Sequence, residues 1–370
     1  MRYYIIAGEA SGDLHGSNLI KEIRKLDTDA AIRCWGGDRM QQAGGELVKH
    51  YRDLAFMGFI EVVKNLGTIL QNLKFCKEDI SRFQADALIL IDYPGFNLRI
   101  AEWARAQGLK VIFYISPQVW AWKENRVKKM KQNIDKMLVI LPFEKDYYKN
   151  KWNWEVEYVG HPLVEVVDGF GLGVPGVALG DKPVIALLPG SRKQEILKKL
   201  PVMLAVSKFF PDYRFVVARA PGQEDSFYET LLQPYPGVGS VSDQTYALLK
   251  RSTAALVTSG TATLETALFG VPEVVCYKGS NISYQIAKRL IRVKYISLVN
   301  LIMDKLVVKE LIQNDLTVEN LRKELNELLN NESRKQQLKA DYAALKELLS
   351  QGGHASAKAA GSIVAFLSNK

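Results

Sequence analysis

The stretch IIAGEASGDLHGSNLIKEI, residues 5–23, joins an apolar run to an amphipathic segment through a short loop. The apolar run predicts a buried strand, and the amphipathic segment predicts a helix. Two glycines and a serine, Gly8, Gly12 and Ser11, lie at the junction. Glycines allow the backbone to approach another group closely. The stretch therefore predicts a strand–loop–helix unit whose loop binds a ligand.

Strand-like and helix-like segments alternate along most of the chain. The runs at 86–93 (DALILIDY) and 110–116 (KVIFYIS) are almost continuously apolar, as in strands buried on both faces of a sheet. Such strands alternating with helices are typical of parallel α/β proteins. The sequence therefore predicts the α/β class, built from Rossmann-like parallel sheets.

A glycine-rich, charge-poor stretch near 168–182 (DGFGLGVPGVALGDK) interrupts the alternation, which then starts again. Such a composition indicates a linker. We expect a first α/β domain at 1–166, a second at 167–352 and a C-terminal tail helix at 353–370. Two such domains predict a cleft at their strand ends, where ligands of α/β sheets bind.

The composition and net charge of the chain limit the classes of molecule that we expect it to bind. The chain has 370 residues, of which 48% are hydrophobic, and a formal net charge of +9. The composition is that of a soluble globular protein, without a signal peptide or a run long enough to span a bilayer. A basic chain suits anionic lipids or phosphorylated small molecules, whereas the motifs of nucleic-acid-binding proteins are missing. We therefore expect an anionic small molecule or lipid and no nucleic acid.

The candidate metal ligands do not form a site. Cys34, Cys76 and Cys276 are scattered and lack metal-ligand spacing, which indicates a reducing cytoplasm. The four histidines lack such spacing as well. The pattern DTD at 27–29 matches a metal motif of some sugar transferases, but it follows a predicted helix instead of a strand. The sequence predicts no metal and no cofactor.

Two loops of the second half suit a phosphate. A predicted strand ends in SGTATLE at 259–265, where unpaired N–H groups at the start of a helix attract anions. Glu265 is placed to accept hydrogen bonds from a ribose; the alternative is an ordinary helix cap. The five residues expected at the helix tip are Ser259, Gly260, Thr261, Ala262 and Thr263.

The second phosphate loop is LLPGSR at 187–192, again between a strand and a helix. Gly190 and Ser191 permit close approach, and Arg192 offers a fork of donors to phosphate oxygens. The alternative is an exposed arginine in a simple turn. No Walker pattern occurs, which disfavours a P-loop ATPase.

In the first half, Asp92 ends the apolar run at 86–93. A partly desolvated carboxylate at the end of a parallel strand can serve as a general base toward a hydroxyl. The alternative is an aspartate that stabilises a turn. Gln118 and Trp120 follow the next strand and suit contact with a sugar, or equally the edge of a core.

Seven motifs taken together resemble the lipid-A-disaccharide synthase family. They occur in the order typical of that family and span nearly the whole chain: AGEASGD (7–13), IDYPGFN (91–97), YISPQVWAW (114–122), LPFEK (141–145), LLPGSR (187–192), SGTATLE (259–265) and VNLI (299–302). The resemblance implies a GT-B fold and an inverting glycosyltransferase. Its substrates would be UDP-2,3-diacylglucosamine and 2,3-diacylglucosamine 1-phosphate, joined in a β(1→6) disaccharide with release of UDP.

The resemblance also implies roles for single residues. Asp92 would be the base toward the acceptor's 6-hydroxyl, and Arg192 would stabilise the departing UDP. The helix at Thr261 would bind diphosphate, with Glu265 on the ribose and Asn300 in the nucleotide half. The opening loop would face the transferred sugar, through Ser11 on the UDP-sugar and Gly8, Glu9, Gly12 and Asp13 on the acceptor or sugar side.

Two rivals and one departure remain. Another GT-B enzyme, such as a UDP-N-acetylglucosamine transferase or 2-epimerase, would use similar phosphate loops. A nucleotide-sugar-binding protein without catalysis would tolerate loss of Asp92. Some family members carry an acidic residue where this chain has Gly95, so we assign no second carboxylate there.

The resemblance implies membrane association. Aromatic and aliphatic residues precede a predicted amphipathic helix near 66–76, and they exceed what one buried stripe needs: Phe56, Met57, Phe59, Ile60 and Val63. We expect this segment to meet an anionic membrane surface, the alternative being a buried helix. The protein would be cytoplasmic and peripherally bound to the inner membrane. The family includes dimers that exchange C-terminal segments, so a homodimer is a possibility that the resemblance leaves open for this chain.

Overall fold

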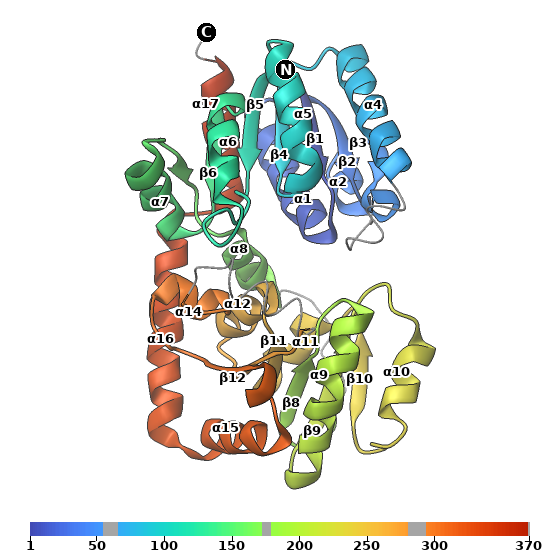
Figure 1. Ribbon diagram of the computed structural model, residues 1–370, viewed down its shortest axis with the longest axis vertical. Helices are drawn as coiled ribbons and strands as arrows, with labels where there is room; N and C mark the ends of the chain where they lie inside the picture. The colour runs from blue at the N-terminus through green and yellow to red at the C-terminus, as the bar shows by residue number, and fades with distance from the viewer. Residues whose placement is uncertain (55–65, 172–178, 280–293, 369–370) are drawn as a thin grey trace. The chain divides into compact units, whose positions relative to one another are not determined.

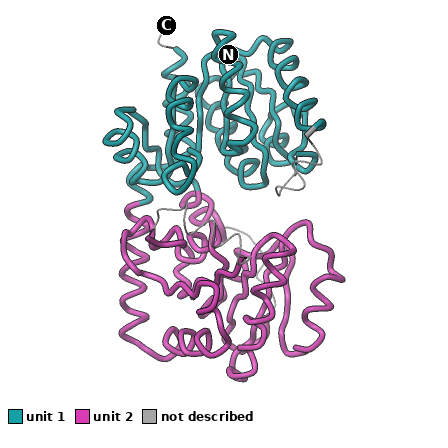
Figure 2. Tube along the Cα trace, in the orientation of Figure 1, with its two compact units in different colours: residues 1–162, 349–370 teal, residues 163–348 magenta. Residues whose placement is uncertain are grey.

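The computed structural model describes residues 1–54, 66–171, 179–279 and 294–368 (Figure 1). The chain divides into two compact units (Figure 2). Unit 1 comprises 1–162 and 349–370, and unit 2 comprises 163–348. The last residues therefore belong to unit 1, whereas the sequence suggested a separate tail helix. The division at 162/163 lies four residues before the expected boundary at 166/167.

Unit 1 contains a parallel sheet, as the continuously apolar runs predict. The described strands form one seven-stranded sheet in the order β3-β2-β1-β4-β5-β6-β7. The strand bounds are β1 Arg2–Ala7, β2 Ala31–Gly36, β3 Glu46–His50, β4 Ala87–Ile91, β5 Lys110–Tyr114, β6 Lys136–Val139 and β7 Glu157–Tyr158.

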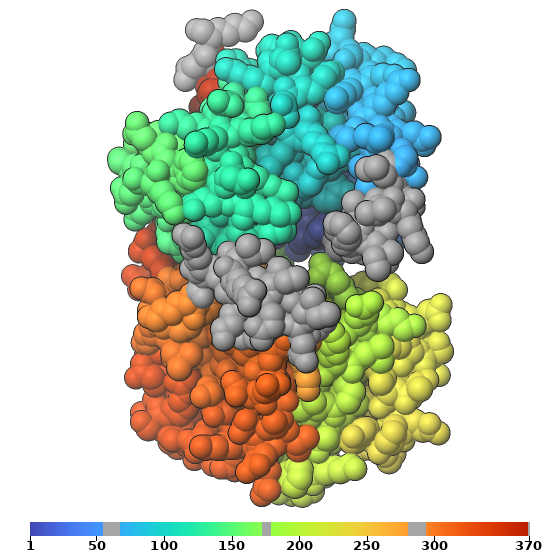
Figure 3. All heavy atoms as spheres, in the orientation of Figure 1, coloured from blue at the N-terminus to red at the C-terminus, as the bar shows by residue number. Residues whose placement is uncertain are grey.

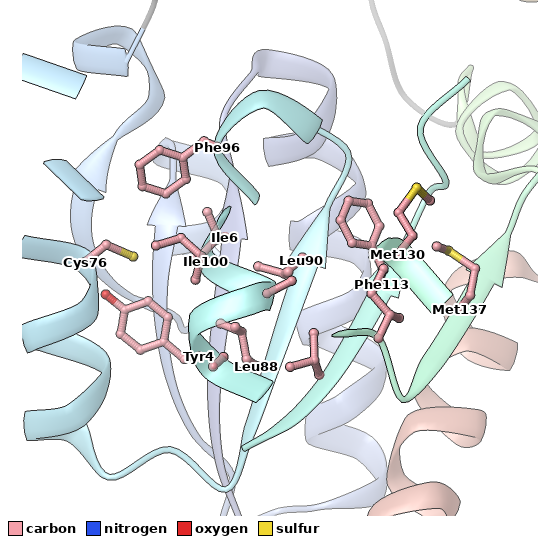
Figure 4. Close-up of a cluster of buried hydrophobic side chains, with 14 of the residues drawn as sticks. Tyr4, Ile6, Cys76, Leu88, Leu90, Phe96, Ile100, Phe113, Met130 and Met137 are labelled. Atoms are coloured by element: carbon pink, nitrogen blue, oxygen red, sulfur yellow. The ribbon is translucent and has the colours of Figure 1, made fainter. Parts of the chain in front are cut away.

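The helices of unit 1 cover both faces of its sheet (Figure 1). On one face α4, α5 and α6 pack side by side, and elsewhere α1 packs against α17. Figure 4 shows the core on the first face, where Leu88 and Leu90 of β4 point toward Phe96 and Ile100 of α5. The helix bounds are α1 Ala10–Leu26, α2 Asp38–Gln42, α4 Leu66–Phe83, α5 Pro94–Ala106, α6 Val127–Asn133, α7 Pro142–Trp152 and α17 Ala355–Ser368.

Unit 2 repeats the design with a six-stranded parallel sheet in the order β10-β9-β8-β11-β12-β13 among the described strands. The strand bounds are β8 Val184–Leu188, β9 Arg214–Arg219, β10 Gly239–Ser242, β11 Ser252–Thr258, β12 Glu273–Tyr277 and β13 Lys309–Ile312. The helices are α8 Pro162–Gly169, α9 Lys193–Val206, α10 Asp225–Leu232, α11 Thr245–Lys250, α12 Thr261–Leu268, α14 Leu298–Met303, α15 Val318–Asn330 and α16 Glu332–Ser350.

Each sheet has one point where the strand order reverses. In unit 1 it lies between β1 and β4, and in unit 2 between β8 and β11. Ligands of open α/β sheets bind beyond the carboxyl ends of the strands at such a point. Four of the loops that the sequence singles out follow these four strands and so lie at the switch points, whereas the loop with Gln118 and Trp120 follows β5.

None of the helices described for this chain is long and apolar enough to cross a membrane.

The C-terminal helix reaches unit 1 through a tight backbone crossing. In α17, which packs on α1, Ala355, Ala359 and Ile363 are fully buried. Just before it, a Cβ atom on Gly352 would lie 2.3 Å from the backbone nitrogen of Gly160. The return of the chain to unit 1 therefore depends on the missing side chain at residue 352.

We expect Gly352→Ala to destabilise unit 1 by about 1–3 kcal/mol, because backbone atoms must move to admit the methyl group. Gly361→Ala is the matched control, since a Cβ there has nothing within 4 Å outside its own helix. That control should be neutral or stabilise the helix by about 0.5–1 kcal/mol. Denaturant unfolding of both variants measures the difference, and equal stabilities would contradict the crossing.

Candidate active site

Asp92 lies in a strained turn at the end of β4. Asp92 and Tyr93 have φ values of 44° and 49°, a left-handed conformation that costs about 1–3 kcal/mol for a residue other than glycine. The buried Asn97 side chain supports this turn: its Nδ2 donates to the carbonyl oxygen of Asp92 at 2.7 Å and to that of Ile91 at 3.2 Å. Such supported strain is typical of functional sites.

The opening loop packs directly on this turn. A Cβ atom on Gly8 would lie 2.3 Å from atoms of the Tyr93 ring, so only glycine fits between β1 and the aromatic side chain. Glu9 follows, and its charge raises the pKa of both Asp92 and Tyr93. The glycine that opens the quoted loop is therefore explained by the neighbouring Asp92 turn.

The carboxyl groups of Asp92 and Glu144 differ in pKa. Burial, with repulsion from Glu9 added, raises the pKa of Asp92 to about 6. Burial raises the pKa of Glu144, on α7, to about 8 although it accepts hydrogen bonds, and the charge of Asp92 raises it further. Near pH 7 Glu144 is therefore mainly protonated, whereas Asp92 is mainly ionised and can act as a base.

Trp120 and Gln118 occupy the loop that follows β5. The Trp120 indole is half-buried and donates from Nε1 to Glu144 Oε1 at 3.2 Å. The other oxygen of Glu144 accepts from the backbone N–H of Leu141 at 3.0 Å. Gln118 and Ser11 are exposed. Trp120 is thus held by Glu144, a residue that sequence analysis did not select and whose pKa the charge of Asp92 raises.

Asp13 has a structural role. Its buried carboxylate accepts from the backbone N–H groups of Gly37 at 2.7 Å and Met40 at 3.0 Å, at the start of α2. The neighbouring Gly12 packs on Ala7, where a Cβ atom would lie 3.0 Å from that of Ala7. These bonds hold the carboxylate at the start of α2, and the expected contact of Asp13 with the acceptor or sugar stays a prediction.

We expect Asp92→Asn to raise the melting temperature in a pH-dependent way. An unfolded aspartate ionises near its usual pKa of 3.8, whereas that of folded Asp92 is about 6. Ionisation therefore costs stability that builds up from about pH 4 to pH 6 and stays constant above, about 1–3 kcal/mol in full. Thermal unfolding at pH 4 and pH 7.5 should show the larger gain at pH 7.5. An equal gain at both pH values would mean that the substitution relieves backbone strain and not the cost of the buried charge.

In unit 2, the loop after β8 presents Arg192 at the start of α9. Gly190 has a φ of 113°, which favours glycine. Arg192 is exposed and donates to Glu195 Oε1 at 3.0 Å, and Lys199 Nζ lies 3.7 Å from Glu195 Oε2. Lys199 is buried and also donates to the Thr258 hydroxyl at the end of β11. One carboxylate is therefore shared by two cations, which leaves a net positive charge where the two phosphate loops meet.

The loop after β11 forms an open helix start. Gly260, with a φ of 132°, is the N-cap of α12, and within the described residues no side chain caps the helix. The alternative of an ordinary Ser/Thr cap is therefore not observed. The Ser259 hydroxyl donates to the carbonyl oxygen of Ile296 at 2.8 Å. Thr261 is exposed, Ala262 is half-buried and Thr263 is buried.

Glu265 lies inside α12, about one turn beyond its start. Its Oε1 accepts from the Tyr246 hydroxyl at 2.9 Å, and burial raises the pKa of the carboxyl group. A carboxylate has room for several donors. Tyr246, which sequence analysis did not select, therefore orients the group expected on the ribose.

The Asn300 side chain holds the loop before β13 in place. Its amide nitrogen donates to Val308 O at 2.8 Å and Glu310 Oε1 at 2.9 Å, and its oxygen accepts from the N–H groups of Val307 and Val308. These four bonds use the whole capacity of the amide. The expected place of Asn300 on the UDP-sugar side stays a prediction. The predicted membrane-facing residues, at 56–63, lie outside the described part of the chain.

Solved structures define the class of protein. A UDP-GlcNAc 2-epimerase from Neisseria meningitidis, bound to UDP-GlcNAc, matches with a TM-score of 0.65 and 12% identity, covering 100% of both chains. The glycotransferase of kitacinnamycin matches with a TM-score of 0.66 and 15% identity over 98% of both chains. At such identities the likeness shows the fold alone. The chain has the GT-B fold of these nucleotide-sugar enzymes, which confirms the predicted fold class.

Sequence comparison then gives the family. The lipid-A-disaccharide synthetase family model matches residues 3–364. A lipid-A-disaccharide synthase from Geobacter sulfurreducens is 38% identical over 381 residues, 99% of this chain and 97% of that protein. Another from Coxiella burnetii is 35% identical over 365 residues, 95% of both chains. The chain belongs to the lipid-A-disaccharide synthetase family, and the predicted glycosyltransferase class is confirmed.

Proposed function

We propose that the chain transfers 2,3-diacylglucosamine from UDP to the 6-hydroxyl of 2,3-diacylglucosamine 1-phosphate. The products are the β(1→6) lipid A disaccharide and UDP. Family membership supports the reaction, and one observation carries the mechanism: Asp92, at the switch point of unit 1, has a pKa of about 6. A base is most effective when its pKa lies near the working pH.

The proposed step is a single displacement. The acceptor's O6 attacks the anomeric carbon of the donor from the face opposite UDP, while Asp92 takes the hydroxyl proton. The new C–O bond forms as the bond from that carbon to the UDP oxygen breaks, and its electron pair leaves with UDP. Attack from the opposite face inverts the anomeric centre, which turns an α-linked donor into a β-linked product.

We assign the leaving group to unit 2. The N–H groups at the start of α12 and the Arg192 guanidinium suit the growing negative charge on the diphosphate. Arg192 must loosen its bond to Glu195 to reach a phosphate, and Lys199 beside the same carboxylate lowers the cost of that exchange. Glu265, oriented by Tyr246, would accept from the ribose. The chemistry requires no cofactor in this scheme.

We expect Asp92→Asn to lower turnover by about 10²–10⁴-fold, the usual effect of removing a general base. UDP affinity should stay nearly unchanged, because the nucleotide is assigned to unit 2. Above pH 6 the wild-type rate should level off, and below pH 6 it should fall as Asp92 takes up a proton. Product analysis from both lipid substrates, run with EDTA, measures all of this. A folded variant with near-normal turnover would return Asp92 to the role of a turn residue.

Arg192→Ala is the complementary variant, expected to weaken UDP binding and slow transfer together, because diphosphate loses a charged donor. Lys193→Ala, one residue further on the exposed start of α9, is the control for general loss of charge. Unchanged affinity and turnover in Arg192→Ala would favour the simple-turn alternative.

We further propose that the protein binds the cytoplasmic face of the inner membrane without spanning it. A substrate with acyl chains must be drawn from a bilayer, and α4, which follows 55–65, exposes Leu70 and Phe75. Lys74 and Lys77 on the same helix suit anionic headgroups, each worth about 1 kcal/mol near such a surface. A homodimer stays a prediction of the resemblance.

Serine replacements at Phe56, Met57, Phe59, Ile60 and Val63 should reduce binding to anionic vesicles at low salt while preserving the fold. The matched control is serine at the exposed apolar residues Leu197 and Leu306 of unit 2. Vesicle sedimentation measures binding, and circular dichroism measures folding. The proposal is contradicted if the first variant unfolds, or if the wild-type protein does not bind the vesicles. Either result would mean that this segment belongs to the core.

A further inference from the structure

Unit 1 contains a cavity that the proposed mechanism does not use. It has a volume of about 340 Å³ and lies between α5 and α6, on the face of unit 1 turned to the viewer in Figures 1 and 3. Its walls come from the first two turns of α5, from Arg126 and from α6. Pockets of this size accept small molecules or parts of larger ones.

The floor of the cavity is apolar. Leu98 and Ala101 of α5 line one side, and Met130 and Ile134 line the other. Met130 and Ile134 are 1% and 4% exposed, so both belong to the core and hold the cavity's shape. An apolar floor favours the binding of a hydrocarbon chain and offers neither hydrogen-bond donors nor charge to a free inorganic anion.

The rim is cationic. Arg99, Arg126 and Lys129 line the cavity together with a single carboxylate, that of Glu102. In the described part of the chain, Lys129 is the one of these three cations with a carboxylate partner, Glu102 at 3.7 Å. That pair is exposed and contributes little. Two arginines therefore remain to bind an anion, and paired arginine donors are well suited to phosphate.

The cavity begins where the Asp92 turn ends. Pro94 and Gly95, two and three residues after Asp92, both line it. Arg99 lies one helical turn beyond Gly95, about 6 Å along the axis of α5. A Cβ atom on Gly95 would have nothing within 4 Å, so there is open space beside this residue of the lining. A molecule whose hydroxyl meets Asp92 can thus extend its remaining groups along α5 into the cavity.

We propose that this cavity binds the phosphate-bearing lipid acceptor, with its phosphate on Arg99 and Arg126 and one acyl chain along the apolar floor. The inference rests on the proposed function and gives the acceptor phosphate, to which no residue was assigned, a site in the same unit as the base. The combination of apolar floor, cationic rim and neighbouring base matches a lipid phosphate that also carries a reactive hydroxyl. Neither a free phosphate nor a neutral lipid would use all three.

The test compares the two arginines of the rim with a neighbouring lysine. Arg99→Gln combined with Arg126→Gln removes both proposed phosphate ligands from the rim, whereas Lys128→Gln removes a charge on α6 that does not line the cavity. With donor saturating, we expect KM for the lipid acceptor to rise at least about tenfold in the double variant, since bonds to charged groups are the strong ones. The kcat should change much less, and Lys128→Gln should behave as wild type. An unchanged KM in a folded double variant would overturn the proposal.

A binding experiment separates this proposal from the proposed function. Acceptor binding is measured by titration on the Asp92→Asn background, with and without the two rim changes, so that no turnover is needed. Loss of binding on rim neutralisation supports the cavity even if no disaccharide is ever formed. Normal transfer with unchanged acceptor binding contradicts the cavity alone.

Two further probes identify the ligand's source. Phosphatidylglycerol vesicles without acceptor test a general membrane contact: if the double variant loses vesicle binding but keeps its acceptor KM, the rim serves the bilayer and the proposal fails. Glucosamine 1-phosphate without acyl chains tests the floor. Its binding should be much weaker than that of the acylated acceptor, and equal binding would overturn the assignment of the floor to an acyl chain.

Discussion

The backbone turn at Asp92 and Tyr93 is the constraint on which the site of unit 1 depends. Two consecutive left-handed residues are unfavourable without support. The support comes from the buried amide of Asn97, which holds the end of β4, and from Tyr93, whose ring fills the space that a side chain at residue 8 would need. The turn thereby fixes three things at once: the direction of the Asp92 carboxyl group, the glycine of the opening loop, and the start of α5 with its cavity.

The fold could be predicted because its signals are local. Continuous apolar runs such as ALILI at 87–91 predict strands of a parallel sheet. The loops after β1, β4, β8 and β11 then lie at the two switch points. The contacts of single polar groups could not be predicted in the same way. Asp13 and Asn300 have the chemistry of ligand contacts, yet backbone groups distant in sequence take up their hydrogen bonds. A sequence pattern gives the residue type but not its partners.

The same reason hid several residues that the structure brings to the sites. Glu144 lies in the motif LPFEK, but its raised pKa arises from burial and from the charge of Asp92, and its carboxyl group accepts a hydrogen bond from Trp120. Lys199 looks like one lysine of an exposed pair in the sequence KK at 198–199, and the fold buries it beneath the phosphate loops of unit 2. Its pKa is lowered by that burial. The sequence does contain one indication of this pairing. Lys199 lies four residues after Glu195 on α9, a spacing that makes two side chains neighbours on a helix.

The distribution of charge gives each unit a different task. In unit 1, burial keeps Glu144 mainly protonated while Asp92 ionises near pH 6, so the site gains one base without the cost of two adjacent carboxylates. In unit 2, Arg192 and Lys199 share Glu195 and leave a surplus of positive charge beside an uncapped helix start. A proton acceptor and an anion receiver are the two requirements of an inverting transfer from a nucleotide sugar. The cationic rim on α5 and α6 is a second group of anion-binding side chains. It lies in unit 1 with Asp92, whereas the leaving diphosphate is assigned to unit 2. A phosphate that stays on the acceptor throughout the reaction accounts for that placement.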